Sequence, residues 1–391
     1  MSAPSCVFVV ESGTDVRLVD GLNEGLRLRL LCRRIRGGVE VTRPPRRETL
    51  IEIGPSSRLA FAAWAAVRLV VLRRNYQVVI VQGYALAALV ANLMGRLLRR
   101  PVTMLVCSPI EVYYRCREAA RDPKKPFRNL EYRGLQLLAW LNARVGHHYV
   151  VLSRYLADVV RAHGARTAID VVPVYGVDLE VFSPSDRPRP SPKPALGLPS
   201  TGAVVLFSSR VAPEKDADTL LLALKALRES GTELWVVNRS GGYREFAQRA
   251  AQFGVSNYVL VGEAVDPQSE LTALYQAASI CVQASREEGL GFSPLEALAC
   301  GTPVIATAVG GLLETIIDGQ TGWTYPRGDP RLLAEALREV LANPAEARRR
   351  TELGRELVRA RFERSMVFDH LMEVIRSVIE RRNARGAAPD P

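Results

Sequence analysis

Several features that mark secreted, metal-binding or disordered proteins are missing from this 391-residue sequence. Its six cysteines include no C-x-x-C pair, and each stands in or beside an apolar run, so we expect reduced, buried thiols and no zinc site. Glu11 precedes the first Lys or Arg, which leaves no basic region for a secretory signal, and we expect a cytoplasmic protein. Hydrophobic residues make up 48% and charged residues 24%, a balance that excludes a disordered chain.

One uncharged stretch, Tyr76 to Gly95, has the length of a membrane span. Gln82-Gly83 interrupts it after the β-branched run from Val78 to Val81, and an Ala/Leu-rich run follows. This pattern predicts a buried parallel strand and then a helix, so we reject the membrane span.

Negative charge is scarce in one half of the chain. Residues 1–200 contain 30 Lys and Arg against 16 Asp and Glu, whereas residues 201–391 contain 22 against 25. The excess of positive charge predicts an anionic partner for the first half, such as a membrane surface, a phosphate-bearing substrate or nucleic acid. A solvated, arginine-rich surface is an equally good explanation.

A proline-rich segment divides the chain into halves of similar length. Residues 184–200 are too rich in proline for a helix or an interior strand, so we interpret them as a linker. On each side, short β-rich runs alternate with helical runs of period 3.6, which predicts an α/β fold with two doubly wound parallel sheets. We therefore expect domains at 1–183 and 201–364, a helix at 365–383 and a tail at 384–391. The expected strands are Cys6–Val10, Leu28–Cys32, Val78–Val81, Val102–Cys107, His148–Leu152, Ile169–Pro173, Ala203–Phe207, Glu233–Val237, Tyr258–Val261, Ile280–Gln283 and Pro303–Thr307.

Loops that follow the strands of such sheets bind ligands, and the segment Ser285 to Pro303 is the most informative of them. Glu288 precedes a glycine-bearing turn that lets backbone N–H groups approach a ligand, and Glu296 follows eight positions later near a helix start. Ser293 and Glu296 also fit a capping box, in which the glutamate only satisfies a backbone donor. From the residues alone, the capping box is the favoured interpretation of Glu296.

The segment from Glu288 to Pro303 resembles the E-x7-E motif of the retaining, nucleotide-sugar-dependent glycosyltransferases of family 4, group 1, which have the GT-B fold. The resemblance implies two Rossmann-like domains that face each other across a cleft, with the acceptor bound by the first and the nucleotide sugar by the second. It also implies that the helix at 365–383 crosses back to the first domain. Glu288 would act in catalysis and Glu296 would bind the ribose, while the donor would contact Gly289, Leu290, Gly291 and Phe292.

Two cations follow the expected strand Ala203–Phe207. Arg210 and Lys215 stand five positions apart, where a guanidinium fork and an ammonium can hold a diphosphate. The resemblance gives them that role and gives Val265 and Asp266 a place beside the nucleobase. Asp216 and Asp218 have the spacing of a D-x-D metal site, but this segment opens the expected helix Thr219–Glu229, where an aspartate is a good N-cap, and we expect neither a metal nor a cofactor.

The first half contains fewer indications of chemistry. Many relatives have a histidine after the fourth strand, where this chain has Glu111 at a strand end, so we name Glu111 and Gly13 as acceptor-side candidates. The four histidines, at 147, 148, 163 and 370, are better explained as structural or exposed groups. Residues 113–133 combine seven basic, three acidic and four aromatic residues, which fits a solvated surface first, an anionic membrane second and nucleic acid last.

These observations predict a retaining, metal-independent glycosyltransferase that moves a sugar from a nucleoside-diphosphate sugar to a glycan or lipid-linked acceptor. It would be cytoplasmic, with possible peripheral contact to an anionic membrane, and no nucleic-acid partner is expected. An inactive GT-B scaffold and a nucleotide-sugar epimerase are the alternatives.

Overall fold

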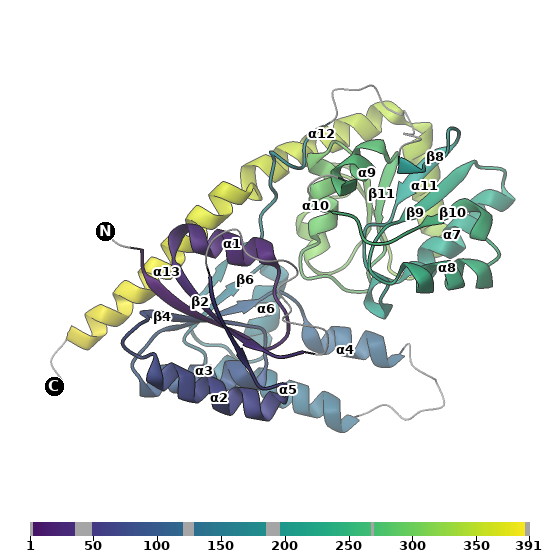
Figure 1. The fold of residues 1–391 in the computed structure, drawn as a ribbon. Coiled ribbons are helices and arrows are strands. Elements are labelled where there is room, and N and C mark those ends of the chain that lie inside the picture. The colour runs from purple at the N-terminus through teal and green to yellow at the C-terminus, as the bar shows by residue number, and fades with distance from the viewer. Residues whose placement is uncertain (1–2, 36–48, 120–128, 185–195, 267–269, 388–391) are drawn as a thin grey trace. The chain divides into compact units, whose positions relative to one another are not determined.

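The computed structural model describes residues 3–35, 49–119, 129–184, 196–266 and 270–387. Contacts divide the chain into two units (Figure 1). Unit 1 comprises Met1–Glu111, Arg128–Gly176 and Ser365–Pro391, and unit 2 comprises Val112–Phe127 and Val177–Arg364.

Unit 1 is built on a seven-stranded parallel sheet with the order β3-β2-β1-β4-β5-β6-β7. Its strands are β1 (Ser5–Val10), β2 (Arg27–Arg33), β3 (Leu50–Gly54), β4 (Val78–Gln82), β5 (Val102–Val106), β6 (His148–Val151) and β7 (Ile169–Val171). Its helices are α1 (Val16–Gly25), α2 (Arg58–Val71), α3 (Leu86–Leu97), α5 (Asn129–Val145), α6 (Arg154–Ala162) and α13 (Arg364–Ala387), while α4 (Ile110–Ala119) begins in unit 1 and continues in unit 2.

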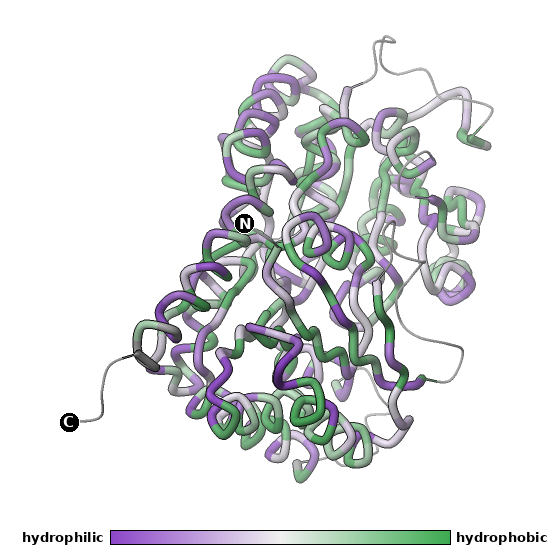
Figure 2. Tube along the Cα trace, turned by 60° about the vertical axis from the view of Figure 1, so that its left-hand side comes forward, coloured by the Kyte–Doolittle hydropathy of each residue, from purple (hydrophilic) through white to green (hydrophobic). Residues whose placement is uncertain are grey.

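The helices of unit 1 cover both faces of its sheet. Figure 1 shows α2, α3 and α5 on one face and α1 with α13 on the other. The central strands are β-branched and buried on both faces, as parallel sheets require. Along α13, hydrophobic and hydrophilic residues alternate (Figure 2), and its apolar residues pack against α1. Phe368 and Met372 lie over Gly21 and Gly25, where a Cβ atom would be only 2.1 Å and 2.5 Å from their side chains.

Unit 2 is built on a six-stranded sheet with the order β10-β9-β8-β11-β12-β13. Its strands are β8 (Ala203–Leu206), β9 (Leu234–Asn238), β10 (Val259–Val261), β11 (Ile280–Gln283), β12 (Val304–Thr307) and β13 (Trp323–Tyr325). Its helices are α7 (Ala217–Glu229), α8 (Tyr243–Gln252), α9 (Thr272–Ala277), α10 (Phe292–Ala299), α11 (Pro330–Ala342) and α12 (Pro344–Arg361), with 3₁₀ turns η2 (Pro213–Lys215), η3 (Ser256–Tyr258) and η5 (Gly310–Glu314).

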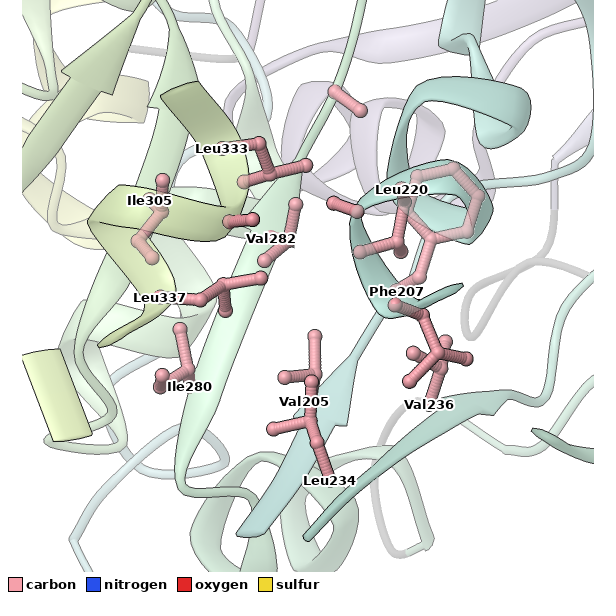
Figure 3. Close-up of a cluster of buried hydrophobic side chains, with 14 of the residues drawn as sticks. Val205, Phe207, Leu220, Leu234, Val236, Ile280, Val282, Ile305, Leu333 and Leu337 are labelled. Atoms are coloured by element: carbon pink, nitrogen blue, oxygen red, sulfur yellow. The ribbon is translucent and has the colours of Figure 1, made fainter. Parts of the chain in front are cut away.

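The core of unit 2 lies between its sheet and the helices α7, α8 and α11. Val205, Val236 and Val282 from the strands meet Leu220 and Leu337 from the helices, and all five are fully buried (Figure 3). Since α7 and α11 pack side by side on this face, the loops that follow the strands are attached to a closely packed, rigid layer.

The eleven expected strands are present, with ends that differ by up to two residues. Two further strands, β3 and β13, escaped the sequence analysis. The stretch Tyr76 to Gly95 forms β4 and most of α3, as predicted, and none of the helices in the described ranges has the length and apolar character needed to cross a bilayer. The cysteines are free thiols, but Cys107 and Cys116 are only half-buried, so the prediction of full burial is wrong for these two.

Candidate functional site

The residues predicted to bind a nucleotide sugar lie at the carboxyl edge of the sheet in unit 2. Arg210 and Lys215 follow β8, and Glu288 follows β11, which pairs directly with β8. Because neighbouring parallel strands end at the same edge, these loops meet, and the Lys215 ammonium forms an ion pair with Glu288 Oε2.

Three donors hold one oxygen of the Glu288 carboxylate. Besides Lys215, Gln283 Nε2 and Ser285 Oγ each donate to Oε2 at 3.1 Å, and the Tyr113 hydroxyl lies 3.4 Å from Oε1. Glu288 is 9% exposed, so a charged carboxylate there depends on these partners. Burial, followed by the charges of Glu288 and Glu214, raises the pKa of Tyr113 well above its usual value, which keeps the hydroxyl protonated as a donor.

The turn after Glu288 leads directly into α10. Gly291 occupies the N-cap with φ 93°, a left-handed conformation that favours glycine, and no side chain caps the helix. Ser293 therefore lies inside the helix, and the capping-box interpretation of Ser293 and Glu296 is wrong. The first N–H groups of α10 have no side-chain cap, as at the helix starts that bind phosphate.

A glycine of η5 contacts the backbone of the turn that follows Glu288. The Gly311 N–H donates to the Glu288 carbonyl at 2.9 Å, and a Cβ atom on Gly311 would lie 2.1 Å from the carbonyl oxygen of Gly289. No residue larger than glycine fits this contact between two backbones. Gly311 thus helps to fix the position of Glu288.

Arg210 is held by a carboxylate that the sequence analysis did not identify. Glu214, in η2, has no exposed surface and accepts from Arg210 at 3.1 Å and from both arms of Arg117 on α4, at 2.7 and 3.1 Å. Burial raises the pKa of Glu214, but the hydrogen bonds and charge of Arg117, with the charge of Arg210, outweigh burial and lower it. Glu214 is therefore an ionised anchor for the Arg210 fork.

Glu296 points into a separate buried group. Its Oε2 accepts from the Tyr275 hydroxyl at 3.0 Å, and that hydroxyl lies 3.0 Å from Ser208 Oγ, after β8. Burial and the Glu296 charge raise the pKa of Tyr275 well above its usual value. The Tyr275 hydroxyl therefore fixes the orientation of the Glu296 carboxylate, which lies at the same carboxyl edge of the sheet as Glu288.

Asp216 and Asp218 are tied to separate arginines. The helix α7 begins at Ala217, two residues before the expected start. Asp216 is its N-cap residue, but with φ 49° it makes no side-chain cap and instead accepts from Thr219 and pairs with Arg286 at 3.1 Å. Asp218 accepts two hydrogen bonds of 2.7 Å from Arg249. The two carboxylates serve different ion pairs.

The remaining candidates belong to other loops of the two units. Val265 and the exposed Asp266 follow β10 at the same edge of the sheet in unit 2. In unit 1, Gly13 follows β1 with φ 50°, and Glu111 is buried with its Oε1 2.8 Å from His163 Nε2. Residues 120–128 of the basic segment 113–133, for which a solvated surface ranked before an anionic membrane, lie outside the described residues.

The predicted site thus gained three residues that pattern analysis missed: Glu214, Gln283 and Tyr275. Glu214 had a local signal, because it stands next to Lys215. The other two come from segments with no charge or motif of their own, and only the strand order brings them to the site.

Comparisons with known proteins concern the second half of the chain and the fold. Residues 189–357 match the family model described as glycosyl transferases group 1. A D-inositol 3-phosphate glycosyltransferase 1 of Catenulispora acidiphila is 34% identical over 249 residues, 57% of this chain and 58% of that protein. One of Xylanimonas cellulosilytica is 36% identical over 237 residues, 58% of this chain and 56% of that protein. The chain therefore matches somewhat more than half the length of these relatives.

Solved structures resemble nearly the whole chain. Sucrose-phosphate synthase from Thermosynechococcus elongatus aligns with a TM-score of 0.79 at 20% identity, over 96% of this chain and 99% of that one. Anabaena Alr3699/HepE in complex with UDP-glucose aligns with a TM-score of 0.74 at 17% identity, over 96% and 100%. Two parallel-sheet units and this likeness over nearly the whole chain show that the chain has the GT-B fold, and residues 189–357 are similar to the group 1 glycosyltransferases.

Proposed function

We propose that this chain transfers a sugar, with retention, from a nucleoside-diphosphate sugar to an acceptor hydroxyl, without a metal. The observation that carries the proposal is the Lys215–Glu288 pair beside the uncapped start of α10. The cation, the carboxylate and the backbone N–H groups of the helix start meet the three demands of such a donor: a diphosphate to neutralise, a sugar to orient and a leaving group to stabilise.

Each cation of the site has a carboxylate partner. Arg210 pairs with Glu214 and Lys215 pairs with Glu288. Arg210 is still 60% exposed, so its fork can bind a phosphate oxygen without leaving Glu214. As the bond to the sugar breaks, negative charge grows on the diphosphate, and these cations stabilise it without the reorganisation that water needs.

The carboxylates act on the sugars. Glu288 is held by Gln283 and Ser285, so it can orient the transferred sugar when Lys215 turns to the phosphate. The departing phosphate would accept the proton of the acceptor hydroxyl in a front-side displacement, because the described carboxylates Glu214, Glu288 and Glu296 each already accept from a cation or a hydroxyl. Glu296 would bind the ribose, with Tyr275 fixing its orientation.

The choice of substrates comes from the relatives. HepE is solved with UDP-glucose, so uridine diphosphate sugars are the first donors to test. The matched curated relatives are D-inositol 3-phosphate glycosyltransferases, which favours a phosphorylated polyol over the lipid-linked or glycan acceptor expected from the sequence. A glycan acceptor with a peripheral, membrane-associated enzyme is the competing arrangement.

The test combines donor turnover with three variants. Labelled UDP-, GDP- and ADP-sugars are offered with and without D-inositol 3-phosphate, and the anomeric configuration of the product is read by NMR. Glu288→Gln and Arg210→Ala should lower turnover by about 100-fold or more with unchanged thermal unfolding. Arg244→Ala, an exposed arginine of unit 2, is the matched control and should leave turnover unchanged.

Three results would contradict the proposal. Near-normal turnover in both site variants removes the roles of Glu288 and Arg210. Absence of any nucleotide binding and donor hydrolysis indicates an inactive scaffold. Conversion of the donor sugar to its epimer without an acceptor indicates an epimerase.

A further inference from the structure

A cavity of about 550 Å³ lies at the amino edge of the sheet in unit 1. Pro101 precedes β5, His148 begins β6, and residues 166–168 precede β7, so the cavity opens where these strands begin. Val378, Arg381 and Arg382 of α13 form another wall. Gly13 and Glu111, the acceptor-side candidates of this unit, lie at the opposite, carboxyl edge of the same sheet.

The lining of the cavity is cationic. It contains Arg96, Arg166, Arg381, Arg382 and two histidines, and it contains no Asp or Glu. Among the described residues, the acid paired with this group is Asp170, whose Oδ2 lies 2.7 Å from His148 Nε2.

The two imidazole rings retain unused polar atoms. His147 Nε2 and His148 Nδ1 are buried and have no hydrogen-bond partner among the described residues, and His148 is only 3% exposed. Buried polar atoms nearly always have a partner, so two such atoms in one cavity indicate a ligand that supplies it.

Positive charges lie close enough to perturb both rings. Burial lowers the pKa of His147 to about 4, and Arg96 and Arg382 add to the shift, against a hydrogen bond with the backbone of Asn92. Burial also lowers the pKa of His148, and Arg381 adds to this, while Asp170 opposes it. Several arginines therefore lie around a partly buried space, and among the described residues Asp170 is the carboxylate that balances their positive charge.

Only some of the cationic side chains that line the cavity can be explained as caps of helix C-termini. Arg96 Nε donates to the Val145 carbonyl at 3.2 Å, at the end of α5, and Arg382 Nε lies 3.5 Å from the Arg99 carbonyl. Arg381 bonds to Ser377 on its own helix. Arg166 makes no hydrogen bond or ion pair within the described ranges, and helix capping does not explain it or the two imidazole atoms.

We propose that this cavity binds a phosphomonoester through Arg166, Arg381 and the two histidines. A phosphate dianion offers several acceptor oxygens to guanidinium forks. Its negative charge favours protonation of the two neighbouring rings, and each imidazolium can then donate from its unpartnered nitrogen, His147 Nε2 or His148 Nδ1. The volume falls within the ~300–1,000 Å³ range of small-molecule sites, so the phosphate is one group of a larger molecule, which Pro101, Ala168 and Val378 contact with apolar surface.

The experiment monitors the rings directly. The full chain has four histidines, so its ring signals in a histidine-labelled sample can be assigned with His147→Gln and His148→Gln. Inorganic phosphate and glycerol 3-phosphate are titrated in separate series, with chloride at equal ionic strength as the reference. Saturable shifts of the His147 and His148 signals are expected, with at least tenfold weaker binding in the Arg166→Ala/Arg381→Ala double variant.

Two control variants separate this site from other basic surfaces. Arg210→Ala weakens phosphate binding in unit 2 and should leave the histidine shifts unchanged. Arg74→Ala removes an exposed arginine of unit 1 outside the cavity and should also have no effect. Because the readout is ring chemical shift, it is independent of whether the chain transfers a sugar.

Vesicles identify the source of the phosphate. Binding to vesicles with phosphatidic acid, but not to phosphatidylcholine vesicles, and its loss in the double variant would assign the cavity to a lipid headgroup. Binding of glycerol 3-phosphate alone would assign it to a soluble metabolite. Absence of saturable histidine shifts with every probe, equal shifts with chloride, or unchanged affinity in the double variant would overturn the proposal.

Discussion

The variant Gly311→Ala should lower turnover while the protein stays folded, and it should do so more selectively than a variant that removes a charged residue. The added Cβ atom would lie 2.1 Å from the Gly289 carbonyl oxygen and 2.8 Å from the Leu290 Cα. Both neighbours are backbone, so no side chain can rotate away, and the turn must move by about 1 Å to reach an ordinary contact. The Gly311 N–H also holds the Glu288 carbonyl, so the displacement reaches the catalytic carboxylate.

The magnitude follows from these distances. A misplacement of about 1 Å in a catalytic group lowers turnover about 100-fold, whereas a forced contact of this kind lowers the free energy of unfolding by about 1–3 kcal/mol. We expect kcat for donor turnover to fall about 100-fold while the protein stays folded at 25 °C. Steady-state turnover, thermal unfolding and UDP affinity would be measured on the same preparations.

The matched control is Gly241→Ala in the same unit. Its Cβ atom would meet only the Cβ of Arg210, at 3.8 Å, which is an ordinary contact. We expect turnover within threefold of the unsubstituted chain. A Gly311→Ala variant with equally high turnover would refute the claim that this glycine positions Glu288.

Two further predictions concern buried titratable groups. Glu214→Gln removes the anchor of Arg210, and because its two arginines are 51% and 60% exposed and can rehydrate, the free energy of unfolding should fall by only about 1–2 kcal/mol while donor KM rises. The exposed Glu335→Gln is its control, and a donor KM that stays the same in Glu214→Gln contradicts the anchoring role. The pKa of His147 is lowered to about 4, so the unfolded chain takes up a proton that the folded chain does not, and stability should fall as the pH drops from about 6.5 to about 4. His147→Gln should flatten that part of the pH dependence of urea unfolding, and an identical profile in the variant would show that the ring is not buried as described.

Most of the fold could be predicted because the strands are encoded locally. Runs such as Val78–Val81 and Ile280–Gln283 are β-branched, buried and bounded by turn residues, so the period of the pattern identifies them. β3 escaped because Leu50, Ile51 and Ile53 are exposed on an edge strand and do not alternate as a half-buried strand does. β13 escaped because it has only three residues.

The candidate site could be predicted only where the chemistry is carried by neighbours in sequence. Glu288 and Glu296 lie eight positions apart, and the structure places both at the carboxyl edge of one sheet. The capping box failed because a glycine with positive φ, Gly291, starts α10 two residues before Ser293. Gln283 and Tyr275 could not be found, because their roles depend on which strands are neighbours, and a single sequence does not state strand order.

The contact of α13 with α1 affects the order in which this protein can fold during synthesis. Phe368 and Met372 fill the space above Gly21 and Gly25, although more than 340 positions separate them along the chain. While the ribosome translates unit 2, α1 exposes an apolar surface that its partner has not yet reached. Unit 2 can therefore complete its fold first. Unit 1, although its first residues leave the ribosome earlier, completes its fold later, and the apolar surface of α1 is available to chaperones in the meantime.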